Sequence, residues 1–322
     1  MDCVLTLDVG SSSARTLLFD IHRQQWDDEL LRLIRVPRAL LPTVRDSSEV
    51  YGETAAGLFD HPIPIAGIAG DQQAALVGQA CFEPGMVKST YGTGCFVLLN
   101  TGDTPVLSKN RMLTTPAYRI KGRTTYAMEG SIFVAGAAVK WLRDGLKVVG
   151  NAAETAALAA QVPDGHGVYM VPAFVGLGAP HWEPNARGLI CGLTLDVTGA
   201  HLARAALESV AYQTLDLTAA MARDGAARAA TIRVDGGMSG NDWFCQFLAD
   251  VLDARVDRPT ELETTALGAA FLAGLATGVW PDLEAVAATW TRGAAFAPKM
   301  AAARRTEAVA GWQIALRRAL AR

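Results

Sequence analysis

The sequence has little charge, few cysteines and no long apolar run. Only 19% of its 322 residues are charged, and 29 lysines and arginines against 32 aspartates and glutamates leave a net charge of −3. Without a block of Lys or Arg the chain lacks the positive surface that nucleic acids require. Half of the residues are apolar, which excludes a disordered chain, yet every apolar run is interrupted before the roughly 18 residues of a membrane span. The sequence therefore predicts a soluble globular protein with neither a nucleic-acid nor a membrane partner.

The cysteines and the N-terminus indicate the cellular compartment. The five cysteines are odd in number and show no C-x-x-C spacing, which argues against a disulfide framework and against a zinc site. We expect buried, reduced thiols. An acidic residue, Asp2, stands where a secretory leader carries positive charge, and the apolar stretch behind it is short. These features predict a cytoplasmic protein.

Hydrophobic periodicity predicts a mixed α/β chain. Small residues within 264–280 provide a helix face that another element can approach closely, and 304–322 forms a basic amphipathic helix that we expect to dock on the surface, with a membrane-surface or partner helix as the alternative. The expected strands are 4–9 paired in a hairpin with 16–20, then 63–70, strands within 87–115, and 232–235. The expected helices are 26–34, 72–77, 131–142, one that follows Asn241, 264–280 and 304–322, with a loop over 37–48.

One sequence pattern occurs three times: an apolar strand followed by a glycine-rich turn with hydroxyl or acidic residues. The turns are Asp8 to Ser13, Tyr91 to Phe96 and Asp235 to Asn241. Glycines let backbone N–H groups converge on an anion, and hydroxyl groups add further donors. Each alone is more typical of an ordinary tight turn, but together they favour a site that encloses the phosphates and sugar of a nucleotide. None is a Walker A loop or a G-x-G-x-x-G loop, so P-loop and Rossmann chemistry are not supported.

Four stretches, two of which overlap these turns, resemble the glycerol kinases of the FGGY carbohydrate kinase family. They are GIAGDQQAA over 67–75, STYGTGCF over 89–96, the segment from Val171 to Gly188, and RVDGG over 233–237. The first fifteen residues also resemble the family's opening phosphate motif. The resemblance implies an α/β, actin-like ATPase fold of two ribonuclease-H-like domains that close on ATP, Mg²⁺ and a polyol. We expect 1–80 to be the remnant of the first domain and 81–322 to be the nucleotide-binding second domain.

The resemblance also implies roles for individual residues. Asp71 resembles the catalytic base, because a carboxylate at a strand end can accept the hydroxyl proton as the oxygen attacks in line; taken without the resemblance, it is more typical of a helix N-cap. Gln72 and Phe96 resemble polyol-site residues, although Phe96 alone is more typical of a core aromatic. Asp8 resembles the acid that works with Mg²⁺. The residues that resemble the nucleotide site are Ser11, Ser12, Ser13, Arg15, Gly92, Thr93, Gly136, Gly237, Asn241 and Lys140, the last standing where glycerol kinases often have Gln.

The sequence departs from the family between Arg15 and Trp26, where most of the family's first domain is absent. The resemblance places the glycerol clamp in that segment, and no Gln-Arg-Glu run occurs in the 322 residues. A hydrogen bond to a charged partner contributes about 1.5 to 3 kcal/mol, so losing an Arg and a Glu contact weakens glycerol binding by roughly 10² to 10⁴-fold. We expect an impaired kinase for glycerol or a similar polyol, with a homo-oligomer or a complementing chain as its partner. The alternatives are a nucleotide-binding or interaction module without turnover, and a pentulose or hexulose kinase.

Overall fold

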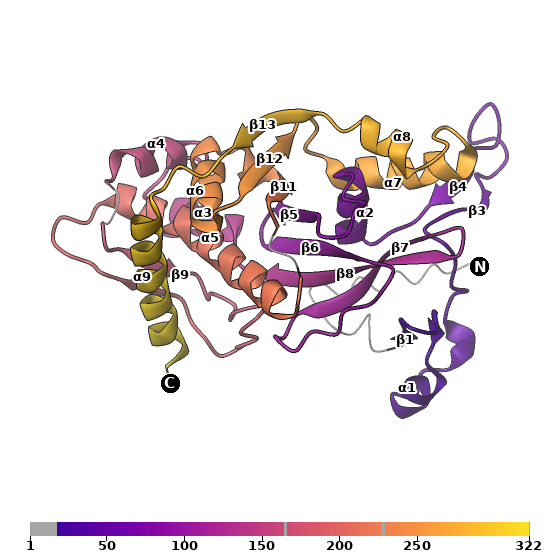
Figure 1. The fold of residues 1–322 in the computed structure, drawn as a ribbon, viewed down its shortest axis with the longest axis horizontal. Helices are drawn as coiled ribbons and strands as arrows, with labels where there is room; N and C mark the ends of the chain where they lie inside the picture. Colours follow the sequence, from indigo (N-terminus) through magenta and orange to yellow (C-terminus); the bar gives the residue numbers. More distant parts are fainter. Residues whose placement is uncertain (1–17, 164–165, 227–228, 322) are drawn as a thin grey trace.

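The structure is a computed structural model that describes residues 18–163, 166–226 and 229–321. The strand predicted over 4–9 lies outside these ranges. A mixed nine-stranded sheet with the order β13-β12-β11-β5-β6-β8-β7-β3-β4 runs along the molecule (Figure 1). Its strands are β3 (Ser48–Glu53), β4 (Pro64–Gly67), β5 (Val87–Tyr91), β6 (Cys95–Gly102), β7 (Leu113–Ile120), β8 (Arg123–Ile132), β11 (Thr231–Asp235), β12 (Arg255–Pro259) and β13 (Arg292–Phe296).

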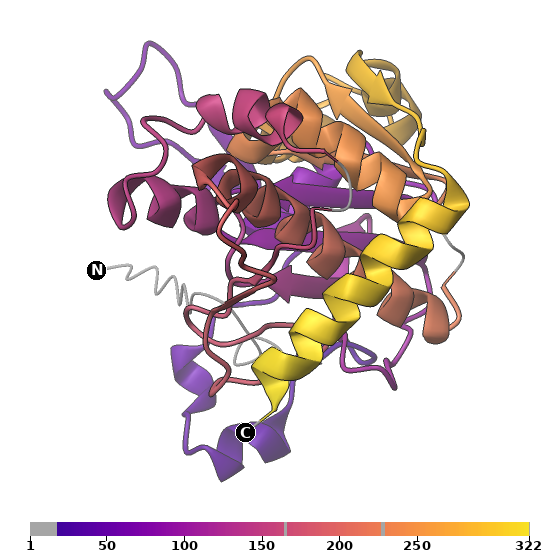
Figure 2. The same ribbon diagram turned by 90° about the vertical axis from the view of Figure 1, so that its left-hand side faces the viewer.

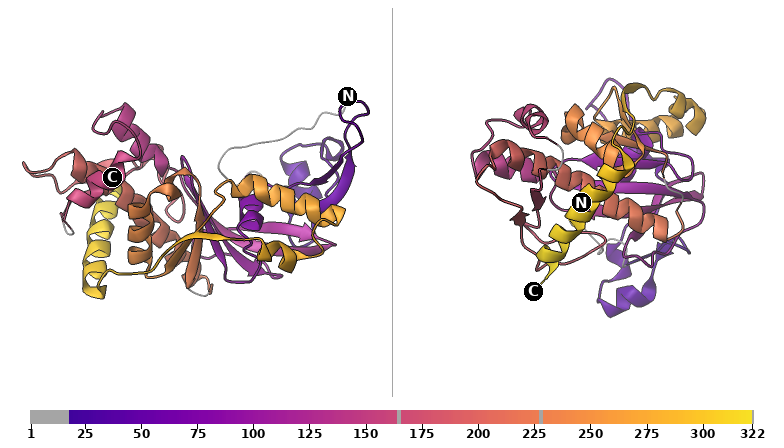
Figure 3. Two further views of the ribbon diagram at one scale, coloured as in Figure 1. Left: turned by 90° about the horizontal axis from the view of Figure 1, so that it is seen from above. Right: turned by 60° about the vertical axis from the view of Figure 1, so that its left-hand side comes forward.

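Helices cover both faces of the sheet, and the side chains of β6 divide between them. Val97 and Leu99 belong to the core that includes α5 and α6, whereas Leu98 between them belongs to the core that includes α2 and α7. This period of two is what a strand buried on both faces requires. Seen from above in Figure 3, α2, α7 and α8 gather toward one end of the molecule and α3 to α6 with α9 toward the other. The main helices are α2 (Asp71–Gly78), α3 (Gly136–Asp144), α4 (Glu154–Gln161), α5 (Gly199–Arg223), α6 (Asp242–Leu252), α7 (Thr264–Thr277), α8 (Leu283–Ala288) and α9 (Ala302–Leu320).

Helices α2 and α7 pack backbone to backbone, as the small residues of α7 predicted. A Cβ built on Gly268 would overlap the carbonyl oxygen of Ala74, and one built on Gly78 would overlap that of Thr264. Only glycine at both positions lets the two helices approach this closely. The close-packing face is confirmed, and α7 ends at Thr277, three residues before the predicted end.

The C-terminal helix α9 docks along the side of the molecule, as Figure 2 shows. Its Trp312 is fully buried, and the indole Nε1 donates a hydrogen bond of 2.8 Å to Oδ2 of Asp216 in α5. The docked-helix prediction is therefore confirmed. Among the helices that the structure describes, none combines the length and the apolar character that crossing a bilayer requires.

The helix predicted over 131–142 begins later than expected. Ser131 and Ile132 still belong to β8, where they pair with Phe96 and Cys95 of β6. Helix α3 begins only at Gly136, because the chain there turns back onto the loop after β5: Ala135 N donates to Thr93 O at 2.9 Å and Gly136 N to Gly92 O at 3.0 Å. A distant turn, which local periodicity does not report, fixes the start of this helix.

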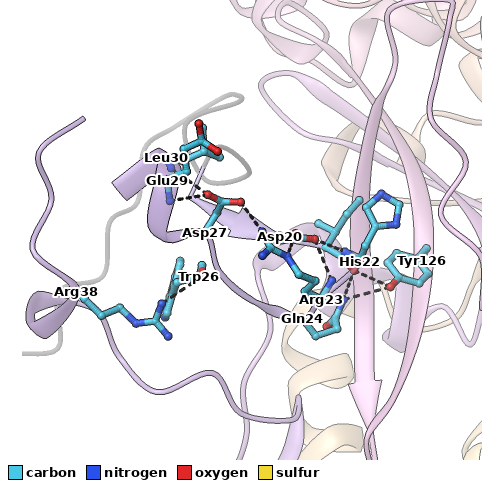
Figure 4. Close-up of polar contacts among 11 residues, drawn as sticks. Asp20, His22, Arg23, Gln24, Trp26, Asp27, Glu29, Leu30, Arg38 and Tyr126 are labelled. Atoms are coloured by element: carbon cyan, nitrogen blue, oxygen red, sulfur yellow. Dashed lines mark hydrogen bonds and ion pairs between the residues drawn. The ribbon is translucent and has the colours of Figure 1, made fainter. Parts of the chain in front are cut away.

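The N-terminal segment forms a small unit against β8. Strand β1 (Phe19–Asp20) pairs with β2 (Gln25–Trp26). The described part of the strand predicted over 16–20 therefore pairs with a strand that follows it in the sequence. Helix α1 (Asp28–Leu33) follows with Asp27 as its N-cap, and confirms the predicted helix with trimmed ends. In Figure 4 the hydroxyl of Tyr126 donates to the carbonyl oxygen of Ile21 at 2.7 Å, which ties the unit to β8. The remaining short elements are η1 (Arg38–Leu40), β9 (Tyr169–Val171), β10 (Leu189–Cys191) and η2 (Gly237–Gly240).

Strand β3 was not predicted, and with β4 it forms the far end of the sheet. It joins β7 through one parallel pair, Ser48 with Ile120, and it pairs antiparallel with β4. Helix α7 covers this ribbon, since Ser48 Oγ donates to the carbonyl oxygen of Leu272 at 2.7 Å. In β3 the two apolar residues, Val50 and Tyr51, are adjacent, so its sequence lacks the alternation that identifies strands.

Candidate active site

A cavity of about 860 Å³ lies beside the turn after β5. Ligand pockets in proteins are typically roughly 300 to 1,000 Å³, so the cavity has room for a nucleotide. Five segments line it: the end of β5 with the turn that follows, one side of α3, the start of α4, Leu207 of α5 (Gly199–Arg223), and η2 with the start of α6. Six residues that the sequence predicted for nucleotide binding are among its lining residues: Gly92, Thr93, Gly136, Lys140, Gly237 and Asn241.

Glycines allow these segments to meet. A Cβ on Gly136 would come within 2.6 Å of the carbonyl oxygen of Gly92, so α3 could not start against the turn with another residue there. Gly236 has φ of +82°, and a Cβ on it would come within 2.6 Å of the carbonyl oxygen of Tyr91. By contrast, a Cβ on Gly237 would meet nothing within 4 Å, which leaves open space beside its backbone. This is the geometry that lets a ligand approach the main chain.

Asn241 joins two walls of the cavity. Its Oδ1 accepts from the backbone N–H of Phe244 at 3.0 Å, which makes it the N-cap of α6. Its Nδ2 donates to Oγ1 of Thr155 in α4 at 3.2 Å. The hydrogen bond to Phe244 and the hydrogen bond to Thr155 together fix the amide at the cavity surface. On the α3 side, Lys140 and Arg143 place two positive charges in the lining.

Asp71 lies at the strand-to-helix turn that the sequence predicted, as the first residue of α2. It is not the N-cap, because that position is taken by Gly70. The carboxylate is exposed, and both of its oxygens face Gln72: Oδ1 accepts from the backbone N–H at 2.9 Å, and Oδ2 lies 3.3 Å from the side-chain Nε2. An exposed, oriented carboxylate at a helix N-terminus is available to accept a proton from a ligand.

Gln72 contacts a buried lysine that the sequence analysis missed. Nζ of Lys88 in β5 donates to Oε1 of Gln72 at 2.6 Å and to Oγ1 of Thr90 at 3.0 Å. Lys88 is 0% exposed, and this burial lowers the pKa of its ammonium group, with Asp235 first among the acidic groups that act in the opposite direction. A charged residue inside the otherwise short buried run VKSTY was the available sequence signal.

The predicted residues fall into two neighbouring groups. Asp71 and Gln72 form one together with Lys88, which was not predicted. The residues around the cavity after Tyr91 form the other, and Thr90 connects the two groups along β5. Phe96 is half-buried at the start of β6, where it pairs with Thr90 across the ladder. It therefore lies beside the first group and is not a fully buried core aromatic. The sequence analysis also missed the α4 wall of the cavity, since the run of alanines there carries no chemical signal.

The predicted metal and phosphate residues of the N-terminus are not placed. Asp8, Ser11, Ser12, Ser13 and Arg15 all lie outside the described residues. Within the described ranges, no group of three or more His, Cys, Asp or Glu side chains could hold a metal ion. Magnesium bound with a nucleotide takes few protein carboxylates and several phosphate and water oxygens, so a cluster of acidic side chains among the described residues is not required for it.

Sequence comparisons identify the family of the chain. Residues 87–277 match the sequence model of the FGGY family of carbohydrate kinases, C-terminal domain, and residues 3–78 match that of the N-terminal domain. The chain belongs to the FGGY family of carbohydrate kinases. It is 63% identical over 310 residues to glycerol kinase of Gluconobacter oxydans and 61% identical over 309 residues to that of Rhodospirillum centenum. Both matches cover 96% of this chain, but it spans only 60% and 62% of those relatives' length.

Solved structures give the same picture. A crystal structure of Plasmodium falciparum glycerol kinase with ADP matches with a TM-score of 0.88 and 35% identity, over 95% of this chain and 62% of that one. A ligand-bound xylulose kinase from Lactobacillus acidophilus matches with a TM-score of 0.79 at 21% identity, and so reports on the fold alone. The expected actin-like ATPase fold is confirmed, together with the expectation that the chain is shorter than its relatives.

Proposed function

We propose that this FGGY family member catalyses ATP-dependent phosphorylation of glycerol or a similar small polyol. The observation that carries the proposal is the meeting of six separately predicted residues around one 860 Å³ cavity. Strand β5 leads from that cavity to the lysine that holds Gln72 beside Asp71. Strand β5 would thus connect a nucleotide in the cavity with the group that bears an exposed carboxylate, and transfer to a hydroxyl group needs such a base.

The described residues would divide the chemistry as follows. Asp71 would accept the proton of the attacking hydroxyl, and Gln72 would hold that hydroxyl in position. Lys140, Thr93 and the backbone around Gly92 would face the nucleotide, while Gly237 and Asn241 would lie against its adenosine portion. Asp8 would hold Mg²⁺, which when bound offsets the charge of the transferring phosphoryl group.

An assay of ADP release with glycerol and ATP-Mg²⁺ tests the proposal. We expect slow turnover by the natural chain and none by Asp71→Asn, which keeps the shape of the side chain but cannot take up a proton. Asp196→Asn serves as a matched control, because Asp196 is also an exposed aspartate but lies away from the cavity lining. Equal traces of ADP from the natural chain and from Asp71→Asn would remove the enzymatic proposal.

A nucleotide-binding module without turnover is the second candidate. It is favoured by the length of the chain, which spans 60% of the Gluconobacter oxydans glycerol kinase, and by the absence of a Gln-Arg-Glu run. Calorimetry with ATP-Mg²⁺ shows whether the chain binds the nucleotide, as both candidate functions require. Heat of binding together with no ADP release supports the module, and no heat at millimolar nucleotide excludes both. Assays with a pentulose and a hexulose in place of glycerol test the remaining substrate alternatives.

The partner that we propose is a second copy or a complementing chain at the β3–β4 end of the sheet. Exposed apolar side chains gather in this part of the sequence: Val50, Leu58, Phe59, Ile63, Ile65 and Ile68. Within the described residues β4 is also an edge strand, and an edge with apolar neighbours favours association. Light scattering should show particles larger than the 34.0 kDa monomer, and Ile65→Glu should shift them toward the monomer. Leu195→Glu, at a leucine that is more exposed than Ile65 and lies elsewhere, should not.

A further inference from the structure

The contact between Lys88 and Gln72 fixes more than the position of one side chain. Lys88 and Thr90 lie on the face of β5 that meets α2, opposite to Val87 and Tyr91, which belong to the α5–α6 core. From this buried position the ammonium group reaches Gln72 Oε1 at 2.6 Å. On the other side of the same amide, Nε2 lies 3.3 Å from Oδ2 of Asp71. The carboxamide thus bridges a buried cation and an exposed carboxylate.

The chemistry of the two neighbours permits one orientation of this amide. An ammonium group only donates hydrogen bonds, and an ionised carboxylate only accepts them. If the amide were turned over, its NH₂ group would face Lys88 and its oxygen would face Asp71, so both contacts would become repulsive. The oxygen must therefore face Lys88 and the NH₂ group must face Asp71. One of the two amide hydrogens serves the carboxylate, and the other meets no acceptor among the residues that the structure describes, which leaves it for a ligand.

We propose that Lys88 is a positioning residue that sets Gln72 as a hydrogen-bond donor toward the substrate. This inference rests on the proposed function, in which Asp71 takes the hydroxyl proton. A hydroxyl group that gives its proton to Asp71 can accept the free hydrogen of Gln72 through its oxygen. The ligand class that this arrangement selects is an alcohol that donates and accepts at the same atom. A group that only donates, such as a protonated amine, would be rejected.

A purely structural role for Lys88 predicts something different. A buried ammonium group costs desolvation, but its removal alone leaves Gln72 Oε1 and Thr90 Oγ1 without this donor, so Lys88→Met should fold with a lower melting temperature under either role. The kinetics of the folded fraction separate the two roles. If the lysine matters only to the fold, kcat per folded molecule is unchanged. If it positions Gln72, kcat per folded molecule falls.

The decisive variant is Gln72→Glu, which keeps an oxygen for Lys88 but has no hydrogen to donate. We expect kcat with glycerol to fall about 10- to 100-fold, as befits a lost hydrogen bond beside a charged group, with the Kd for ATP unchanged. Gln73→Glu is the matched control on the next residue, whose amide donates to Thr115 Oγ1 instead. Since Gln72 is partly exposed, the variant should fold. Retained kcat in Gln72→Glu overturns the proposal, because an acceptor would then suffice.

A double-mutant cycle asks whether Lys88 acts through Gln72. Lys88→Met alone should lower kcat about as much as Gln72→Met, and the two together no further, whereas losses that multiply would refute the connection. Lys88→Arg, which still donates, should recover part of the loss.

Should the natural chain show no turnover, the proposed function fails but the positioning claim is still tested by NMR. Lys88→Met must then shift the side-chain amide resonances of Gln72 and leave those of Gln73 in place; unchanged Gln72 resonances would count against it.

Discussion

Gly236 stands with its backbone against Tyr91, so that a Cβ on Gly236 would come within 2.6 Å of the Tyr91 carbonyl oxygen. The contact joins the end of β11 to the end of β5, the two parallel strands whose following turns line the cavity. With φ of +82° as well, the position excludes a side chain for two independent reasons.

Gly236→Ala should therefore destabilise the protein. Strain from the backbone angle alone costs about 1 to 3 kcal/mol, and the overlap with a carbonyl group adds to it. The neighbouring Gly237→Ala is the control, since it meets no atom within 4 Å and its φ lies outside the left-handed region. Urea denaturation of both variants measures the difference, and equal midpoints would contradict the described turn.

A larger side chain at Gly237 should affect binding rather than stability. Gly237 lines the cavity, and the side chain of a valine there would project into open space. Gly237→Val should therefore weaken ATP binding at least about tenfold through steric exclusion. Calorimetry gives the Kd and thermal denaturation gives the stability. A normal Kd in the variant would show that the nucleotide binds elsewhere.

Trp312→Phe should loosen α9. The variant keeps an aromatic ring in the core but removes the N–H that donates to Asp216 Oδ2 at 2.8 Å. A hydrogen bond to a charged group contributes about 1.5 to 3 kcal/mol, and the free energy of unfolding should fall by that amount. Trp141→Phe, on the half-buried surface of α3 beside Phe174, should cost less.

The buried cysteines make stability fall at high pH. Burial raises the pKa of Cys81, Cys95 and Cys245 to about 12, above the roughly 8.5 of a thiol in the unfolded chain. Above pH 8.5 the unfolded state therefore binds fewer protons than the native state. The stabilising contribution is complete below that pH and is lost as the pH rises toward 12.

Urea unfolding at pH 8 and pH 10 measures this loss. Each buried thiol should account for roughly 2 kcal/mol of the decline, so Cys95→Ala should show a decline smaller by that amount. A variant with the same pH dependence as the natural chain would contradict the expectation. Cys191 is half-buried, and it should react with thiol reagents in the native protein before the three buried cysteines do.

The sequence predicted the parts of the site that depend on local chemistry. The turn at Gly92 and the cap at Asn241 could be recognised because glycine and asparagine are needed there for backbone reasons that neighbouring residues reveal. Lys88 stands out only as a charged residue within a predicted strand, and its role could not be predicted from that, because its partner Gln72 comes from another element and its burial depends on strands far along the chain. The start of α3 and the existence of β3 could not be predicted for the same reason. Tertiary contacts, of α3 with Gly92 and of β3 with α7, determine where these elements form.

The close fit of α2 against α7 has a consequence for synthesis on the ribosome. Helix α2 comes early in the chain, yet its packing partner begins only at Thr264. Short helices are marginal in water until they pack. The packing of the segment that bears Asp71 is therefore completed only after the residues of α7 have been translated, although α2 also meets β5, β6 and β7, which come earlier in the chain.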